Sequence, residues 1–396
     1  MTQKESLAEY LFAVIRGKKS GLGPALFLAL MKLFSWGYYA IIWSMCRLYS
    51  SGLFSKQKLP CFVVSLGNIT VGGTGKTPTA ERMASEFLAR GYKVAILNRG
   101  YRGTWRGIAE IVSDGEKMLM TAQECGDEAY LLAANLPGVG VVIGRDRYTS
   151  GLLAIKEYGA EVLILDDAFQ HWQLARDLDI VLIDATDDLL KNHILPRGTL
   201  REPLSGLKRA SMFFLTKTDH AGQQRLEEIK GYLERINPSA PIIETNHKPA
   251  GFIEIENWYS GKATAILPID TVSGHKVLAF SALGNPASFE NTIVGLGGEV
   301  YQQVRFPDHH SYTMAEMQRI LIRAVASGVS ALVTTEKDAV KIPAEFIHRF
   351  RKLPIYVLKI QVFSNEEEEF DKVQQKIAAM IAKKRLELAE DRQRFS

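Results

Sequence analysis

The sequence has few of the features that mark metal-stapled, secreted or nucleic-acid-binding proteins. Its 396 residues include three cysteines, at no metal-ligand spacing, and such an odd, scattered count is typical of reduced thiols in a cytoplasmic protein. The formal net charge is +4, which is too small to favour binding to nucleic acid. Low-complexity tracts and internal repeats are also lacking. We therefore expect a folded cytoplasmic protein that is long enough for two domains.

One N-terminal segment is far more apolar than the rest of the chain. Residues 24–46 carry a single charge, Lys32, together with two tryptophans and two tyrosines, and no cleavage site of small residues follows them. The segment just has the length of a membrane span, but a mid-run charge is costly there and the aromatic rings suit the headgroup boundary. We favour a helix that lies in the membrane interface over a true span or a buried core helix. The basic cluster Arg16, Lys18 and Lys19 suits the cytoplasmic face.

Apolar runs that end in polar loops recur along the rest of the chain. We expect strands at 61–68, 93–100, 139–144, 162–167, 179–185 and 212–219, with a helix over 79–90. This alternation predicts an α/β fold with a doubly wound, mostly parallel sheet, which binds ligands at the carboxyl ends of its strands. A seam rich in proline and turn residues follows, and then a smaller α/β unit with strands at 276–283, 331–335 and 355–360 and a terminal helix over 366–394.

This pattern divides the chain into four parts. Residues 1–50 form the membrane-associated helical segment, 51–235 the nucleotide-binding domain, 236–275 the seam, and 276–396 the smaller C-terminal domain.

A glycine-rich turn joins the first predicted strand to the first predicted helix. Glycines let the backbone wrap around phosphate, the lysine neutralises the β and γ charges, and the threonine hydroxyl binds Mg²⁺ at the helix N-terminus. The turn departs from the usual P-loop pattern, because Thr70 stands where a glycine is expected. Val71 stands where partition-type ATPases carry a signature lysine. The predicted phosphate-binding residues are Gly72, Gly73, Thr74, Gly75, Lys76, Thr77 and Pro78.

Two adjacent carboxylates follow another apolar strand. Asp166 and Asp167 end the run VLILDD, which is the arrangement of a Walker B motif that holds Mg²⁺. Gln170 and His171 come directly after and would face the same crevice. Asp127 precedes a helical run, which is also typical of a simple helix cap.

A pair of histidines lies in the segment FPDHH. His309 and His310 are compatible with a surface loop as well as with a site, and no partner ligands for zinc occur at the usual spacing. Two further segments, TKTD at 216–219 and TEKD at 335–338, look like the guanine-reading motif of GTPases. Loop arginines such as Arg201 suit phosphate recognition.

Taken together, these residues resemble the tetraacyldisaccharide 4'-kinases, the lipid A 4'-kinase family. The matching segments span most of the chain in order, and such a series is far more specific than one phosphate loop. The family pattern usually has glycine where this chain has Ala168, and alanine does not take positive φ freely. The matching segments are SLGNITVGGTGKTP (65–78), LNRGYRG (97–103), GDEAYLLA (126–133), LDDAFQH (165–171), LPRGTLREP (195–203), FSALGNP (280–286), FPDHHSY (306–312) and TTEKDAVK (334–341).

The resemblance implies a P-loop fold and an ATP- and Mg²⁺-dependent kinase of lipid A biosynthesis. The substrate would be a tetraacylated glucosamine disaccharide 1-phosphate, phosphorylated on its 4'-hydroxyl at the cytoplasmic face of the inner membrane without an obligate protein partner. Asp127 would be the general base, supported by His309, and Lys76 and Thr77 would hold phosphates and Mg²⁺. Asp166 and Asp167 would organise the metal. The reacting centre would be lined by Gln170, His171 and Arg201.

Two other interpretations stay open on the residues alone. A P-loop GTPase or partition-type ATPase would act as a switch and hydrolyse nucleotide without an acceptor. A membrane adaptor that retains a relic nucleotide fold would have lost the reaction, although intact Lys76, Thr77, Asp166 and Asp167 argue against it.

Overall fold

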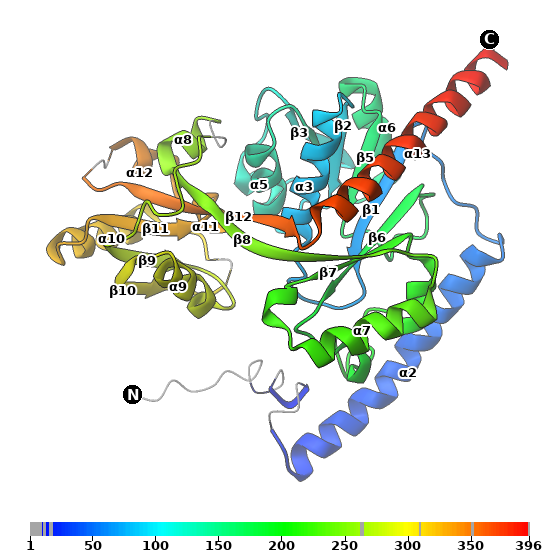
Figure 1. Cartoon of the computed structure of the whole chain (residues 1–396), viewed down its shortest axis with the longest axis horizontal. Coiled ribbons are helices and arrows are strands. Elements are labelled where there is room, and N and C mark those ends of the chain that lie inside the picture. The colour runs from blue at the N-terminus through cyan, green and yellow to red at the C-terminus, as the bar shows by residue number, and fades with distance from the viewer. Residues whose placement is uncertain are drawn as a thin grey trace. The chain divides into compact units, whose positions relative to one another are not determined.

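The structure is a computed structural model, and it describes residue 10 and residues 13–15, 19–261, 265–308, 310–349 and 352–394 (Figure 1). The chain divides into two compact units, each built from several segments. The first comprises Met1–Lys76, Asp167–Asn246 and Ser364–Gln375, and the second comprises Thr77–Asp166, His247–Phe363 and Lys376–Ser396. The domain boundaries expected from composition, at residues 50, 235 and 275, remain predictions.

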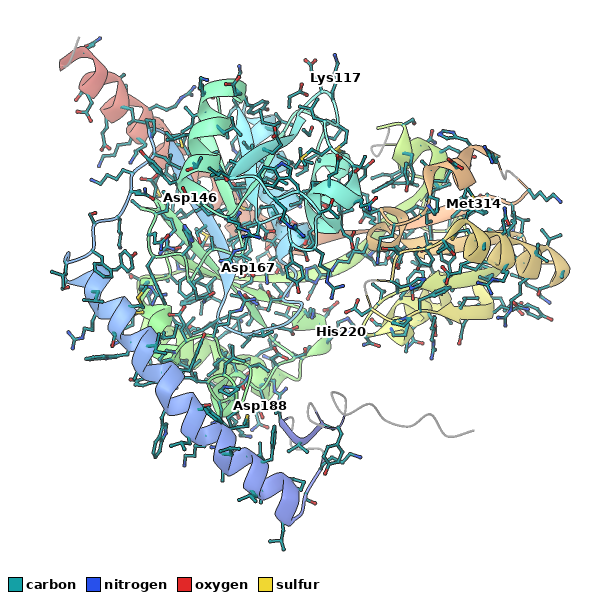
Figure 2. All side chains as sticks on the ribbon, turned by 180° about the vertical axis from the view of Figure 1, so that it is seen from behind. Lys117, Asp146, Asp167, Asp188, His220 and Met314 are labelled. Carbon is teal, nitrogen blue, oxygen red and sulfur yellow. The ribbon has the colours of Figure 1, made fainter. Side chains whose placement is uncertain are left out.

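The apolar N-terminal segment forms one long helix, α2 (Leu22–Ser50). Gly21 has a φ of 132°, outside the helical region, and Pro24 lies in the first turn, where a missing N–H costs nothing. The helix is long and apolar enough to cross a membrane by length and composition. It lies at the edge of its unit, and the side chains on its outer face point away from the rest of the unit (Figures 1 and 2). Arg16 and Lys18 of the basic cluster lie outside the described residues.

The first unit contains a parallel sheet with the strand order β1–β6–β7–β8. These strands are β1 (Phe62–Asn68), β6 (Leu178–Asp184), β7 (Met212–Thr216) and the first part of β8 (Ile242–Glu254). Helix α7 (Gln223–Ile236) buries Leu226, Ile229 and Leu233 in the same core as Phe213 and Leu215 of β7. Short 3-10 turns connect these elements at Leu189–Lys191, Leu204–Arg209 and Thr218–His220.

The N-terminal half of the second unit has the strand order β5–β2–β4–β3. Strands β5 (Val162–Asp166), β2 (Val94–Asn98) and β4 (Gly140–Gly144) are parallel, whereas β3 (Ala109–Asp114) runs antiparallel to β4. Its helical elements are α3 (Lys76–Ala89), α4 (Ala122–Cys125), α5 (Asp127–Asn135), α6 (Arg147–Leu153) and a π-helical turn at Ala154–Tyr158.

The C-terminal half of the second unit has a parallel sheet with the strand order β10–β9–β11–β12. The strands are β9 (Lys276–Ser281), β10 (Glu299–Arg305), β11 (Ala331–Thr335) and β12 (Ile355–Ser364). The helices are α8 (Ile255–Tyr259), α9 (Pro286–Gly295), α10 (Met314–Ala326), α11 (Glu336–Ala339) and α12 (Ala344–Arg349). The chain ends in α13 (Glu367–Arg394).

The predicted α/β class and the mostly parallel strand pairing are confirmed, but three strands escaped the sequence analysis. Strand β10 pairs on one side with β9 and alternates between exposed and half-buried residues, so it lacks an apolar run. Strand β3 is likewise only partly buried and is interrupted by a bulge. Strand β8 occupies the predicted seam and contains Pro249, a residue that ordinarily argues against a strand.

Candidate active site

The phosphate loop lies between β1 and α3, as predicted. Gly72 and Gly75 have φ values of 141° and 84°, which a residue with a side chain rarely adopts. Lys76 and Thr77 are the first two residues of α3. The first N–H groups of a helix have no partner within it, so this turn can surround a phosphate with backbone donors and the positive end of the helix dipole.

The structure explains why Thr70 can replace a glycine. Thr70 is 4% exposed and forms an antiparallel bridge with Leu200. On either side of this bridge, Val71 N–H donates to the Thr199 carbonyl (2.8 Å) and Arg201 N–H donates to the Ile69 carbonyl (2.8 Å). The first half of the loop is therefore extended backbone, in which any residue fits, and positive φ is confined to Gly72 and the residues after it.

The TKTD segment holds the phosphate loop from another side. Lys217 Nζ donates to the Gly73 carbonyl (3.0 Å) and pairs with the Asp184 carboxylate at the end of β6. The Thr216 hydroxyl donates to the Thr74 carbonyl (3.1 Å). Two residues of the TKTD segment, which resembles a guanine-reading motif, thus hold the phosphate loop in its conformation.

The TEKD segment has a different role. Asp338 is fully buried and accepts from Ala282 N–H (3.0 Å) and from the Thr335 hydroxyl, and its carboxylate pairs with Lys341 Nζ (3.2 Å). These contacts make Asp338 an internal brace between the end of β9 and α11.

The predicted carboxylate pair lies at the end of β5, where the two side chains have different partners. Asp166 is 4% exposed and accepts from Asn98 Nδ2 (2.7 Å) at the end of β2. Asp167, labelled in Figure 2, accepts from Arg201 Nη1 (2.7 Å), and its Oδ1 lies 3.7 Å from Lys76 Nζ. Lys76, Asp167 and Arg201, three residues predicted to belong to the site, therefore form one charged cluster beside the phosphate loop.

The backbone after β5 is unusual, and the unusual residue is one position earlier than expected. Asp167 adopts a φ of 51°, whereas Ala168 is buried and donates its N–H to the Leu66 carbonyl (3.1 Å). Positive φ is tolerated by aspartate better than by most residues. Alanine at 168 is accommodated because the left-handed turn does not fall on it. A Cβ on Gly67 would lie 2.6 Å from Phe169 N, so glycine lets this loop approach β1 closely.

Gln170 is held by a residue that the sequence analysis did not single out. Its Nε2 donates to the Asn68 carbonyl (3.0 Å) and to Glu202 Oε1 (2.8 Å). Glu202 is fully buried and is paired with Arg209 (2.8 Å), whose guanidinium lies 4.5 Å from the centre of the Phe169 ring. The sequence did offer a clue to Glu202, because it directly follows Arg201, the arginine that binds Asp167. His171 lies next to Gln170 and is half-buried.

Asp127 is the first residue of α5, and the N-cap position belongs to Gly126. Gly126 has a φ of 89°, and a Cβ there would lie 2.3 Å from the Tyr101 carbonyl oxygen. The capping interpretation of Asp127 is therefore wrong: Gly126 takes the N-cap without a side-chain hydrogen bond, and the carboxylate of Asp127 lies at the positive end of the helix dipole.

His309 lies outside the described residues, but its neighbour His310 is well held. The His310 ring stacks on Phe306 with centroids 4.6 Å apart, and its Nε2 lies 3.1 Å from Glu316 Oε2. Hydrogen bonds from Thr313 N–H and then from His310 lower the pKa of Glu316 to about 2. The loop next to His309 is thus anchored to the capping box of α10.

Among the described residues, no group of three or more His, Cys, Asp or Glu side chains is placed so that it could hold a metal ion. The oxygen donors near the phosphate loop are carboxylates and a threonine hydroxyl, which are the ligands that Mg²⁺ accepts in small numbers while it keeps several waters. The fold and this site define a P-loop nucleotide-binding protein of the α/β class.

Comparisons with known proteins identify the family. The family model LpxK, described as "Tetraacyldisaccharide-1-P 4'-kinase", matches residues 27–379. A tetraacyldisaccharide 4'-kinase of Desulfatibacillum aliphaticivorans is 38% identical over 87% of this chain and 90% of its own length. One of Halothermothrix orenii is 36% identical over 91% of this chain and 95% of its own length. The chain belongs to the tetraacyldisaccharide-1-phosphate 4'-kinase family.

A solved structure agrees with this assignment. The crystal structure of LpxK from Aquifex aeolicus in complex with ATP is 30% identical, with a TM-score of 0.70 over 90% of this chain and 99% of that chain. The family is one of kinases, so the kinase interpretation is supported over the GTPase and partition-type ATPase interpretations. The roles of individual site residues remain predictions.

Proposed function

We propose that this chain transfers the γ-phosphate of ATP to the 4'-hydroxyl of a tetraacylated glucosamine disaccharide 1-phosphate, a step of lipid A biosynthesis. The proposal rests above all on the cluster of Lys76, Asp167 and Arg201 beside a phosphate loop in a member of this kinase family. Phosphoryl transfer depends mainly on positioning and on neutralisation of charge, and two cations fixed by a shared carboxylate supply both.

The nucleotide phosphates would lie on the loop of residues 72–78. Backbone N–H groups of the loop and of the α3 N-terminus would donate to phosphate oxygens, and Lys76 would balance their charge. Arg201 is held at 2.7 Å by Asp167, so its remaining N–H groups would be directed with little loss of side-chain entropy. Lys217 and Thr216 would keep the loop in its binding conformation through their contacts with Gly73 and Thr74.

Mg²⁺ fits the donors available near this loop. The Thr77 hydroxyl and the carboxylates of Asp166 and Asp167 would hold it, directly or through water. The ion, when bound, would neutralise the charge shared by the β- and γ-phosphates. Asn98, which donates to Asp166, would orient the carboxylate through its hydrogen bond at 2.7 Å.

Asp127 would accept the proton of the attacking 4'-hydroxyl, with His309 as its partner. Asp127 is the first residue of α5, and a base in the first turn of a helix can be positioned accurately. Gln170 and His171 would line the reacting centre, and the contact of Gln170 with buried Glu202 would fix the amide orientation.

The lipid substrate would be taken up at the cytoplasmic surface of the inner membrane, with α2 as the attachment. Its outer face carries exposed apolar side chains, among them Leu26 (75%), Leu33 (61%) and Trp36 (64%). Exposed apolar area of this extent on one helix is typical of membrane contact. The inner face of α2 contacts its own unit, which supports a helix lying in the interface.

The test is transfer of label from γ-labelled ATP to the lipid disaccharide in detergent micelles. We expect labelled lipid with the wild type and a loss of at least about a hundredfold in kcat for Asp127→Ala, because a positioned base contributes about two to four orders of magnitude. Asp371→Ala, which changes an exposed aspartate on α13, is the matched control and should keep full activity. Nucleotide hydrolysis without labelled lipid would instead support the switch ATPase or GTPase.

A further inference from the structure

Helix α2 has an unusual contact with its own unit. In a helix composed largely of apolar residues, its single buried residue is a serine, Ser35, at 7% exposure. An apolar anchor would ordinarily bury leucine or phenylalanine, because the stabilisation scales with apolar area. The most closely packed point of this helix is therefore polar and directional.

Three hydrogen bonds connect α2 to residues 194–201, the segment that ends in Arg201. The Ser35 hydroxyl donates to the Ile194 carbonyl (2.8 Å) and accepts from Arg197 N–H (3.2 Å). One turn further along the same face, the Tyr38 hydroxyl donates to the Arg201 carbonyl (2.9 Å). Every one of these bonds ends on the backbone of the 194–201 segment, so they fix its path independently of its side chains.

The other side of the same segment is bonded to the phosphate loop. Thr199 accepts from Val71, Leu200 forms a bridge with Thr70, and Arg201 donates its N–H to Ile69. The segment is also braced internally, since Leu195 N–H donates to the Leu200 carbonyl (2.9 Å). A single short, stiff stretch of backbone thus lies between the membrane-facing helix and the residues that surround phosphate.

We infer that Ser35 and Tyr38 are positioning residues for the phosphate loop and for Arg201. Through the 194–201 segment they set the loop conformation that binds ATP, so α2 acts in the reaction as well as in membrane attachment. The part of this inference that concerns phosphate transfer rests on the proposed function, whereas the part that concerns ATP affinity does not.

Loss of these hydrogen bonds would lower both the affinity for ATP and the rate of phosphate transfer. Without the Tyr38 hydroxyl, the Arg201 carbonyl loses a donor next to the residue whose side chain pairs with Asp167. Without the Ser35 hydroxyl, both Ile194 and Arg197 lose a partner. The loop and the guanidinium would then sample more positions, which weakens ground-state binding of phosphate and misaligns the transfer.

The test compares the double variant Ser35→Ala/Tyr38→Phe with the matched control Ser44→Ala/Tyr39→Phe. The controls lie on the same helix: the Ser44 hydroxyl donates within the helix to Ala40, and Tyr39 is 42% exposed. We expect the double variant to bind ATP about tenfold more weakly and to transfer phosphate about tenfold more slowly, because the three hydrogen bonds to residues 194–201 are lost. Partition onto vesicles of anionic phospholipid should stay within about twofold of wild type, since the outer face is unchanged. The control variant should match the wild type in all three measurements.

ATP affinity and turnover equal to those of the control would overturn the inference. If the double variant melts at a much lower temperature than the control, Tyr38→Phe alone replaces it in the test, since this change removes one oxygen atom. We expect Tyr38→Phe to lose about threefold in ATP affinity. A loss no greater than that of Tyr39→Phe would overturn the inference as well. Wild-type protein that binds ATP but leaves the lipid unlabelled would overturn the proposed function. The ATP affinities of the double variant and the control would still decide whether Ser35 and Tyr38 position the phosphate loop.

Discussion

Glu81 of α3 is a carboxyl group in an unfavourable position. Asn135 Nδ2 donates to it (2.9 Å) and also to Glu336 (2.7 Å), whose carboxylate pairs with Lys359 (2.9 Å). Two acidic side chains therefore share one amide and one ammonium. Burial, followed by the negative charge of Glu336, raises the pKa of Glu81 to about 8 from 4.5.

This shift has a definite consequence for stability. Between pH 4.5 and about pH 8 the folded protein holds a proton on Glu81 that the unfolded chain releases, so the free energy of unfolding falls as pH rises through this window. The slope is at most about 1.4 kcal/mol per pH unit. Glu81→Gln removes the titration, and we expect its stability relative to wild type to increase from pH 5 to pH 8 in urea unfolding. Glu86→Gln, on the same helix, is the control; parallel profiles for wild type and Glu81→Gln would contradict the prediction.

At the scale of elements, two segments with nearly the same letters do different things. TKTD follows β7 and TEKD follows β11, and both looked like base readers. Lys217 of the first contacts the phosphate loop, whereas Asp338 of the second is fully buried against β9. The difference comes from the strands that the two segments follow, because the carboxyl end of β7 adjoins the phosphate loop within the first unit, whereas Asp338 is bonded to the end of β9 within the second.

Asp338→Asn tests this difference. The change leaves Lys341 buried without its counter-charge, so we expect a loss of about 3 kcal/mol in the free energy of unfolding. The ratio of kcat/KM for ATP to that for GTP should not change. Asp219→Asn, at the corresponding and exposed position of the first segment, should leave stability within about 0.5 kcal/mol. A shift of nucleotide preference in Asp338→Asn would show that the second segment reads the base after all.

At the scale of the whole molecule, we propose separate roles for the two faces of α2. Its inner face contacts the 194–201 segment through Ser35 and Tyr38, and its outer face exposes Leu33 and Trp36. Deletion of the helix would disturb both faces together. Substitution of the outer face separates membrane attachment from nucleotide binding.

We expect Leu33→Gln/Trp36→Gln to lower partition onto phospholipid vesicles by at least about tenfold, because two large apolar side chains no longer enter the lipid. ATP affinity in solution should stay at the wild-type value. Ile322→Gln, a similar change at a residue of α10 that is 69% exposed, is the control for general effects of surface polarity. Unchanged vesicle partition of the double variant would refute an attachment role for this face.

Much of the nucleotide-binding half was predictable from local pattern. Strands such as β1 and β5 are runs of buried apolar residues, and their polar ends lie at the edge of the sheet that the parallel order requires. The phosphate loop and the Asp166–Asp167 pair were therefore placed correctly on their elements. Strands β3, β8 and β10 could not be found in this way, because their burial is partial and comes from tertiary neighbours.

The sequence by itself determined the class of fold, the family and the identity of the chemistry-bearing segments, because these depend on short-range periodicity and on residues that are contiguous in the chain. The tertiary structure alone decided which side chains meet. It paired Arg201 with Asp167, placed Glu202 behind Gln170, and put Ser35 of α2 on the segment that holds the phosphate loop. Those partners are separated by 34, 32 and 159 positions in the chain, and contacts over such separations depend on how strands and loops pack. Local pattern carries no record of that packing.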